Sequence, residues 1–113
     1  MSAKVSYVEL HTQDVDRARA FYGELFGWQF KTVPYQTRYD QIDGPQPGGI
    51  MEEKRGSGYW LQYIDVDDVA ASTQKAERLG AKLITPKTEV PGMGWFSVMT
   101  DPAGASFALW QKA

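Results

Sequence analysis

One pattern constrains the fold of this chain most strongly: a strand, a capped helix and a glycine stop, which recurs half a chain later. Residues 7–12 alternate between polar and apolar side chains, as in a strand with one polar face. Asp14 then offers a carboxylate as a helix cap, and Gly27 can adopt the left-handed conformation that ends a helix. The apolar stripe expected between them consists of Val15, Ala18, Phe21, Tyr22, Leu25 and Phe26.

The second copy of the pattern occupies residues 59–80. Residues 59–66 repeat the strand, Asp68 repeats the cap and Gly80 repeats the stop. After each helix, further strands are expected, at 28–33, 35–43 and 50–54 in the first half and at 82–85, 95–100 and 106–111 in the second. Residues 44–49 and 86–94 are expected to be loops, because each segment holds two prolines and two or more glycines.

Each half therefore has the order strand, helix, strand, strand, strand. Neither half can bury its helix and its sheet face alone, so the two modules should pack together. The predicted fold class is α+β, with two βαβββ modules in tandem forming a curved, barrel-like mixed sheet. We expect a single domain over residues 1–113, with the pseudo-repeat at 1–55 and 59–113.

The composition excludes several classes of function. The 113 residues include no cysteine, so neither a disulfide framework nor a thiolate zinc site is available. Fourteen acidic against twelve basic residues give a formal charge of −2, without a basic surface for nucleic acid or a polybasic membrane anchor. The chain shows neither a secretion signal nor an apolar run that could span a membrane, so we expect a soluble cytoplasmic protein.

Three motifs in this order resemble the vicinal oxygen chelate superfamily, which includes glyoxalase I, bleomycin-resistance proteins and extradiol dioxygenases. They are D-x-x-R-A-x-x-F-Y-x-x-x-F-G at residues 14–27, V-D-D-V at 66–69 and D-P-x-G at 101–104. The resemblance covers nearly the whole chain and is closest to the short, glyoxalase-like members. It implies a glyoxalase-like domain that binds a small organic molecule in an aromatic-lined cup, and a homodimer, since short members of this superfamily commonly pair.

The resemblance also raises the question of a metal. Metal-using members hold a divalent ion with four ligands from four strands, usually His, Gln or Glu. The corresponding positions here are Tyr7, Leu61 and Ala108, and a fourth near Glu52 or Glu53. Leucine and alanine side chains have no lone pair to donate, so at most one ligand position is kept. We expect no metal and no other cofactor.

Two residues on the first strand are candidates for catalysis. Glu9 is the best candidate for a general base, because burial on an aromatic surface disfavours the charged form of a carboxylate. His11 is the only histidine, and its charge changes near neutral pH. Both residues also have ordinary alternatives, a solvated strand glutamate and a strand-end histidine bonded to backbone, and the second alternative is the more frequent one.

The expected ligand-binding residues share strand parity with these candidates. A phenol beside a carboxylate forms a polar clamp for a small ligand, and a tryptophan supplies a flat wall. Half-buried core rings are the alternative for the two tyrosines. The set consists of Tyr7, Tyr63, Asp65 and Trp110.

Three functions remain open on these grounds. The first is metal-free binding of a small molecule, favoured by the loss of metal ligands in an aromatic-rich chain. The second is an enzyme related to lactoylglutathione lyase, a lyase or isomerase that acts on a small oxygen-bearing substrate through Glu9, His11 or Tyr7. The third is a non-catalytic interaction subunit, for which the sequence offers no positive signal. The identity of the ligand does not follow from the sequence.

Overall fold

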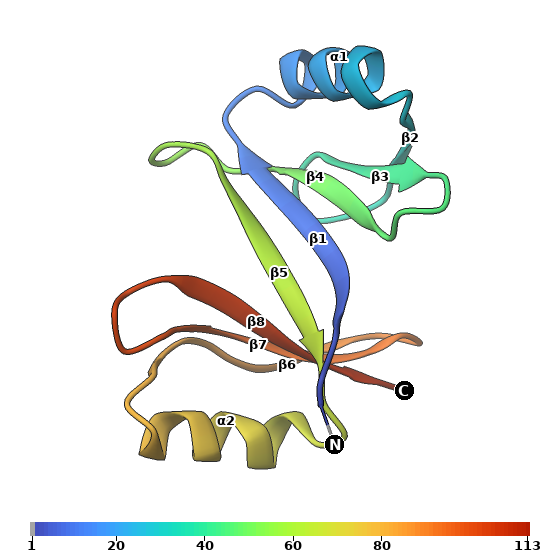
Figure 1. Ribbon diagram of the computed structural model, residues 1–113. Coiled ribbons are helices and arrows are strands. Elements are labelled where there is room, and N and C mark those ends of the chain that lie inside the picture. Colours follow the sequence, from blue (N-terminus) through green and yellow to red (C-terminus); the bar gives the residue numbers. More distant parts are fainter. Residues whose placement is uncertain (1) are drawn as a thin grey trace. The chain divides into compact units, whose positions relative to one another are not determined.

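The computed structural model of the protein describes residues 2–113. It consists of eight strands and two helices in the order expected, with βαβββ in each half, which confirms the α+β class (Figure 1). No helix in residues 2–113 is long and apolar enough to cross a membrane. The elements are β1 (Val5–Thr12), α1 (Val15–Phe26), β2 (Gln29–Val33), β3 (Tyr39–Asp43), β4 (Gly48–Glu52), β5 (Tyr59–Asp65), α2 (Val69–Arg78), β6 (Lys82–Val90), β7 (Gly94–Thr100) and β8 (Ser106–Lys112).

The chain divides into two compact units. The N-terminal unit contains residues 7–61, and the C-terminal unit contains residues 62–113 together with 2–6. In the N-terminal unit the strand order is β2-β3-β4-β1, in which β1 runs parallel to β4 and the other neighbours are antiparallel. Helix α1 packs on one face of this sheet, against β2, β3 and β4 (Figure 1).

The ends of α1 are set by the two residues expected from the sequence. The Asp14 carboxylate accepts a hydrogen bond of 3.0 Å from the backbone N–H of Arg17, which satisfies one of the open donors of the first turn. Gly27 has φ +73° and closes the helix with a bond from its N–H to the Gly23 carbonyl. The core below the helix consists of Leu10, Val15 and Ile50, with Ala18, Tyr22 and Phe30 packed against it.

Only half of the apolar stripe expected on α1 faces the sheet. Phe21, Leu25 and Phe26 remain 57%, 58% and 55% exposed. The helix faces the sheet with a narrower side, because Arg19 on that side reaches down to a buried aspartate, Asp40. Three large apolar side chains are therefore left on the outside of the N-terminal unit.

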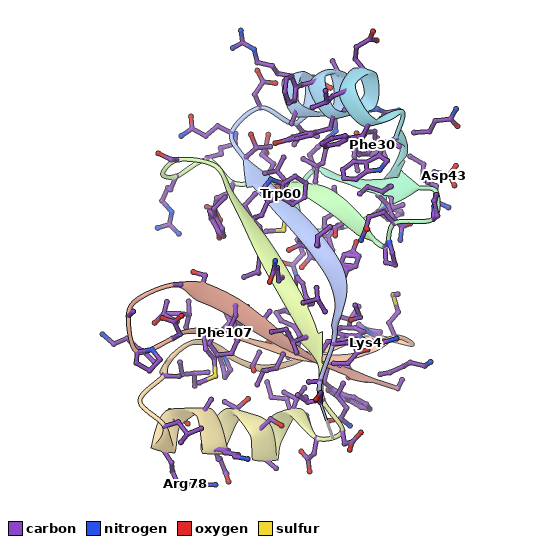
Figure 2. The ribbon with its side chains drawn as sticks, in the orientation of Figure 1. Lys4, Phe30, Asp43, Trp60, Arg78 and Phe107 are labelled. Atoms are coloured by element: carbon purple, nitrogen blue, oxygen red, sulfur yellow. The ribbon has the colours of Figure 1, made fainter. Side chains whose placement is uncertain are left out.

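The C-terminal unit repeats the arrangement with the order β5-β8-β7-β6. Strands β5 and β8 are parallel, and β8, β7 and β6 are antiparallel. Asp68 caps α2 through a bond of 3.0 Å from the Ala71 N–H. The core of this unit contains Val69, Met99 and Leu109, and Figure 2 shows Phe107 on the helix side of the strands.

Two loop predictions are wrong. Gly48 and Gly49 begin β4 and do not form a turn, because a strand without side chains at these positions can lie very close to its neighbours. A Cβ at Gly48 would be 2.5 Å from the carbonyl oxygen of Val8. Strand β6 continues to Val90 instead of ending at Thr85, since it lies at the end of the strand order, where Pro86 is tolerated beside irregular pairing.

Candidate functional site

Strand β1 has an apolar face and a polar face. Leu10 belongs to the core under α1, so the alternation of the strand directs Tyr7, Glu9 and His11 to the other face. The structure brings these three expected site residues together, as predicted. Glu9 is 7% exposed and His11 is 5% exposed, which is unusual for ionisable side chains and requires partners for both.

The partners form a continuous hydrogen-bonded network within the N-terminal unit. The Nε2 atom of His11 lies 2.9 Å from Oε1 of Glu9. The phenol of Tyr39, from β3, donates a bond of 2.7 Å to Oε2 of the same carboxylate. The phenol of Tyr7 lies 2.5 Å from that of Tyr39. We call these four side chains the Glu9 network.

The chemistry of the groups fixes the direction of each bond. An ionised carboxylate only accepts, so with Glu9 ionised the Nε2 of His11 carries the hydrogen. Tyr39 has a single hydrogen and donates it to Glu9, so the bond between the phenols must be donated by Tyr7. In neutral histidine the other ring nitrogen, Nδ1, is then an acceptor. This atom is buried and has no hydrogen-bond partner among residues 2–113.

Aromatic rings surround the network. The ring of Tyr59, the first residue of β5, stacks on the imidazole of His11. The two ring centroids are 4.7 Å apart, and the angle between the ring planes is 9°. The ring of Tyr35 packs edge to face against the ring of Tyr39, with 5.6 Å between the ring centroids. These rings limit the ways in which Tyr39 and His11 can turn, and they offer flat apolar surface beside the polar groups.

The two phenols of the network stay protonated over a wide pH range. Burial raises the pKa of Tyr7 to about 12, and the charge of Glu9 adds to the effect, while the bond to Tyr39 opposes it. Burial and then the Glu9 charge raise the pKa of Tyr39 far above its ordinary value. Both phenols are therefore neutral donors at neutral pH.

Gly49 makes room for the contact between Tyr39 and Glu9. It lies on β4 between β1 and β3, in register with Glu9 on one side and Gln41 on the other. A Cβ at this position would be 2.5 Å from Cε1 and 2.6 Å from the hydroxyl of Tyr39. Only glycine leaves the ring of Tyr39 in its place.

The opposite face of β3 carries a second polar cluster, below α1. The buried carboxylate of Asp40 accepts hydrogen bonds from Arg19 at 2.8 Å, from Arg38 at 2.9 and 3.1 Å and from Thr32 at 3.0 Å. The bonds from Arg38, followed by those from Arg19 and Thr32, lower the pKa of Asp40 to about 2 although burial opposes them. Arg38 also pairs with Asp16 on α1 at 2.8 Å. This cluster ties the helix to β3.

The remaining expected ligand-binding residues belong to the C-terminal unit. In the pairing of β5 with β8, Tyr63 is opposite Ala108 and Asp65 is opposite Trp110. These residues share the face that is turned away from the Leu109 core, as the predicted parity requires. Asp65 accepts a bond of 2.7 Å from Ser6, and Tyr63 meets Phe96 edge to face. Their participation in one site with the Glu9 network stays a prediction.

Comparison with known proteins decides the family. Residues 4–39 match the family model described as bleomycin resistance protein-like N-terminal. The chain is 30% identical to a glyoxylase-like domain-containing protein of Didymella fabae, over 96% of this chain and 94% of that protein. The chain belongs to the glyoxalase and bleomycin-resistance family. This confirms the resemblance to the vicinal oxygen chelate superfamily that the motifs indicated.

Other similar proteins are longer than this chain or share only its fold. The chain is 32% identical to the anthracycline biosynthesis protein DnrV of Streptomyces peucetius, over 95% of this chain and 46% of that protein. It thus spans about half the length of such curated relatives. A methylmalonyl-CoA epimerase of Streptomyces coelicolor, in complex with 2-nitronate-propionyl-CoA, has the same fold with a TM-score of 0.72 and 15% identity, covering 97% of each chain.

The metal ligands known from the family do not fit the residues of this chain. Leu61 and Ala108 are buried and have no lone pair. Tyr7 is bonded to Tyr39, and Glu52 accepts a bond from Thr37 at 3.3 Å. Within residues 2–113 no group of three or more His, Cys, Asp or Glu residues could hold a metal ion. The donor set offers no basis for a reaction step through a divalent ion.

Three residues of the site were not predicted from the sequence: Tyr39, Tyr59 and Gly49. Within the expected strand 35–43, the two-residue repeat of a strand assigns Tyr39 to the face opposite Ile42. What the sequence does not contain is the parallel pairing of β1 with β4. That pairing brings Gly49 beside Glu9 and allows a phenol two strands away to reach the carboxylate.

Proposed function

We propose that this chain binds a small organic molecule against the Glu9 network, without a metal ion. The observation that carries the proposal is the unpartnered Nδ1 of His11. A buried polar atom without a hydrogen bond is costly, by about 1–3 kcal/mol, and is normally retained where a ligand or water supplies the bond.

The surroundings of His11 support this proposal. The carboxylate of Glu9 and the ring of Tyr59 hold the imidazole from one edge and one face, so a ligand finds the acceptor already oriented. Binding sites for small molecules typically combine apolar and aromatic walls with a few fixed polar groups. One relative is named for anthracycline biosynthesis and one structural neighbour is in complex with a CoA ester, and both names agree with a small organic ligand.

The single histidine makes a direct test possible. In ¹⁵N-labelled protein, the ring nitrogens of His11 give one set of signals, because the chain has one histidine. We expect compounds from a panel of small aromatic and oxygen-bearing molecules to shift these signals in a saturable way. The Tyr39→Phe variant should bind more weakly, whereas Lys31→Ala, a change of an exposed residue on β2, should bind like the wild type. If bound compounds leave the His11 signals unmoved, the site lies elsewhere.

A second candidate is an enzyme that moves a proton, related to lactoylglutathione lyase or to an isomerase. The specific observation in its favour is the pair formed by Glu9 and His11. The carboxylate of Glu9 accepts the hydrogen bond from Nε2 and so orients the ring of His11. It also stabilises the imidazolium that forms when Nδ1 accepts a proton. In this reaction His11 is the base and Glu9 orients it, whereas the sequence favoured Glu9 as the base. Both oxygens of Glu9 already accept hydrogen bonds.

The catalytic candidate has its own test. The wild type and His11→Gln would be incubated in D₂O with methylglyoxal–glutathione hemithioacetal and with acyl-CoA thioesters that carry an acidic α-hydrogen. Incorporation of deuterium that is lost in His11→Gln supports proton transfer. Binding without any exchange supports the first candidate alone.

We also propose a cytoplasmic homodimer. The large apolar side chains Phe21, Leu25 and Phe26 stand exposed on α1, and a second copy of the chain would cover them. Sedimentation at micromolar concentration should show a species of twice 12.7 kDa, and Phe21→Asp should shift it toward the monomer. A monomer alone in the wild type would contradict this part of the proposal.

A further inference from the structure

The Glu9 network has a definite polarity that restricts its ligand. All of its hydrogen bonds are donated in the direction of the Glu9 carboxylate. Tyr7 donates to Tyr39, Tyr39 donates to Glu9, and the Nε2 of His11 donates to Glu9. Because the Nε2 hydrogen is used on Glu9, the Nδ1 of neutral His11 can only accept. The hydrogen bond to Glu9 therefore fixes the Nε2–H tautomer of His11 in the ligand-free protein.

We infer that the ligand presents a hydroxyl hydrogen to His11 Nδ1 and belongs to the phenols or enols, a class that combines an O–H donor with a flat ring. This inference rests on the proposed function and deepens it. The donor requirement follows from the acceptor at Nδ1. The flat ring follows from Tyr59 and Tyr35, which pack against His11 and Tyr39 and are still 41% and 53% exposed, so that a further ring can pack on them.

The same polarity excludes other common ligand groups at this atom. Ionised carboxylates, ketones and ethers only accept hydrogen bonds, so they would leave Nδ1 unsatisfied and bring two lone pairs together. A site built to bond a hydroxyl discriminates strongly against an analogue that lacks it, since the buried polar atom then stays unpaired. We therefore expect the site to bind a phenol more tightly than the methyl ether of the same phenol, although the two molecules have nearly the same shape.

Three matched probes test this selectivity at mildly alkaline pH: para-cresol, para-methylanisole and para-toluate. Binding is followed through the ¹⁵N signals of His11 and by titration calorimetry. We expect para-cresol to bind about tenfold or more tightly than para-methylanisole, and para-toluate to bind no better than the ether. The Nδ1 signal should move more than the Nε2 signal, because the new hydrogen bond is formed at Nδ1.

Variants separate the hydrogen bond from the shape of the site. His11→Phe keeps a ring beside Tyr59 but removes the acceptor, and should bind the cresol and the ether within a factor of about two of each other. Lys31→Ala should keep the wild-type preference. If His11→Phe does not fold, the comparison of the three probes on the wild type decides the matter alone.

The outcomes distinguish this inference from the function on which it rests. If para-toluate or para-methylanisole shifts the His11 signals as strongly as para-cresol does, the ligand class is wrong and the binding site stands. If none of the probes shifts them, the inference is wrong, and the broader panel described above decides whether this face binds any small molecule.

Discussion

The phenol of Tyr39 donates a hydrogen bond of 2.7 Å to the carboxylate of Glu9 although a whole strand, β4, lies between their strands. The bond is possible because β4 contributes Gly49 at the crossing point, where the ring of Tyr39 occupies the space of a side chain. Through this bond a residue of β3 fixes the carboxylate that orients His11 on β1. The organisation of the site thus depends on a position that carries no side chain.

The Gly49→Ala substitution should damage the site directly. Its methyl group would overlap the ring of Tyr39, so that Tyr39 must move away from Glu9. We expect a loss of about 2 kcal/mol in the free energy of unfolding, from overpacking and from the broken hydrogen bond. Urea denaturation measures the loss.

Gly44→Ala is the matched control for this substitution. A Cβ at Gly44 meets nothing within 4 Å, and the residue does not have a positive φ. Its effect should stay within about 0.5 kcal/mol. Equal losses in the two variants would mean that the close contact at Gly49 is not what makes the substitution costly.

The Asp40→Asn substitution should destabilise the N-terminal unit strongly. The amide cannot neutralise the two guanidinium groups of Arg19 and Arg38, which converge on a buried carboxylate. Because the guanidinium groups left behind are 39% and 35% exposed and water can solvate them, we expect a loss of about 2 kcal/mol. Asp43→Asn, at the exposed end of the same strand, should have almost no effect on denaturation. A small loss in Asp40→Asn would show that the cluster contributes little to stability.

The same aspartate predicts how stability depends on acid. The pKa of Asp40 is lowered from 3.8 to about 2, so its contribution is fully present above about pH 4 and is lost as the pH falls toward 2. The difference corresponds to about 2 kcal/mol. Free energies of unfolding measured across this range should fall more steeply in the wild type than in Asp40→Asn. Parallel curves for the two proteins would contradict the assignment.

The sequence predicted much of the scaffold and part of the site. Asp14, Asp68 and Gly27 mark helix ends through local hydrogen bonds and backbone conformation, which depend on nearby residues alone. The alternation of residues 7–12 correctly placed Glu9 and His11 on one face. Tyr39 and Gly49 were missed because their roles depend on which strands pair and in which register, information that is not contained in the local pattern.

Alkaline pH should weaken the fold through Tyr7. Its pKa is raised from 10.0 to about 12, so the protonated phenol contributes stability that is fully present below about pH 10 and is lost as the pH rises through 12. The free energy of unfolding should fall across this range in the wild type and less in Tyr7→Phe. Tyr35→Phe, which changes an exposed phenol, should follow the wild type. A wild-type curve that stays flat to pH 12 would show that Tyr7 is not held in its neutral form.

The tautomer of His11 tests the central claim most directly. Long-range ¹H–¹⁵N correlation spectra of the single histidine, recorded at mildly alkaline pH, show which ring nitrogen carries the hydrogen. The geometry predicts hydrogen on Nε2, bonded to Glu9, and a bare Nδ1; in Glu9→Gln, whose amide can donate or accept, the preference should weaken. A wild-type spectrum with the hydrogen on Nδ1 would contradict the polarity of the network and, with it, the acceptor site proposed for the ligand.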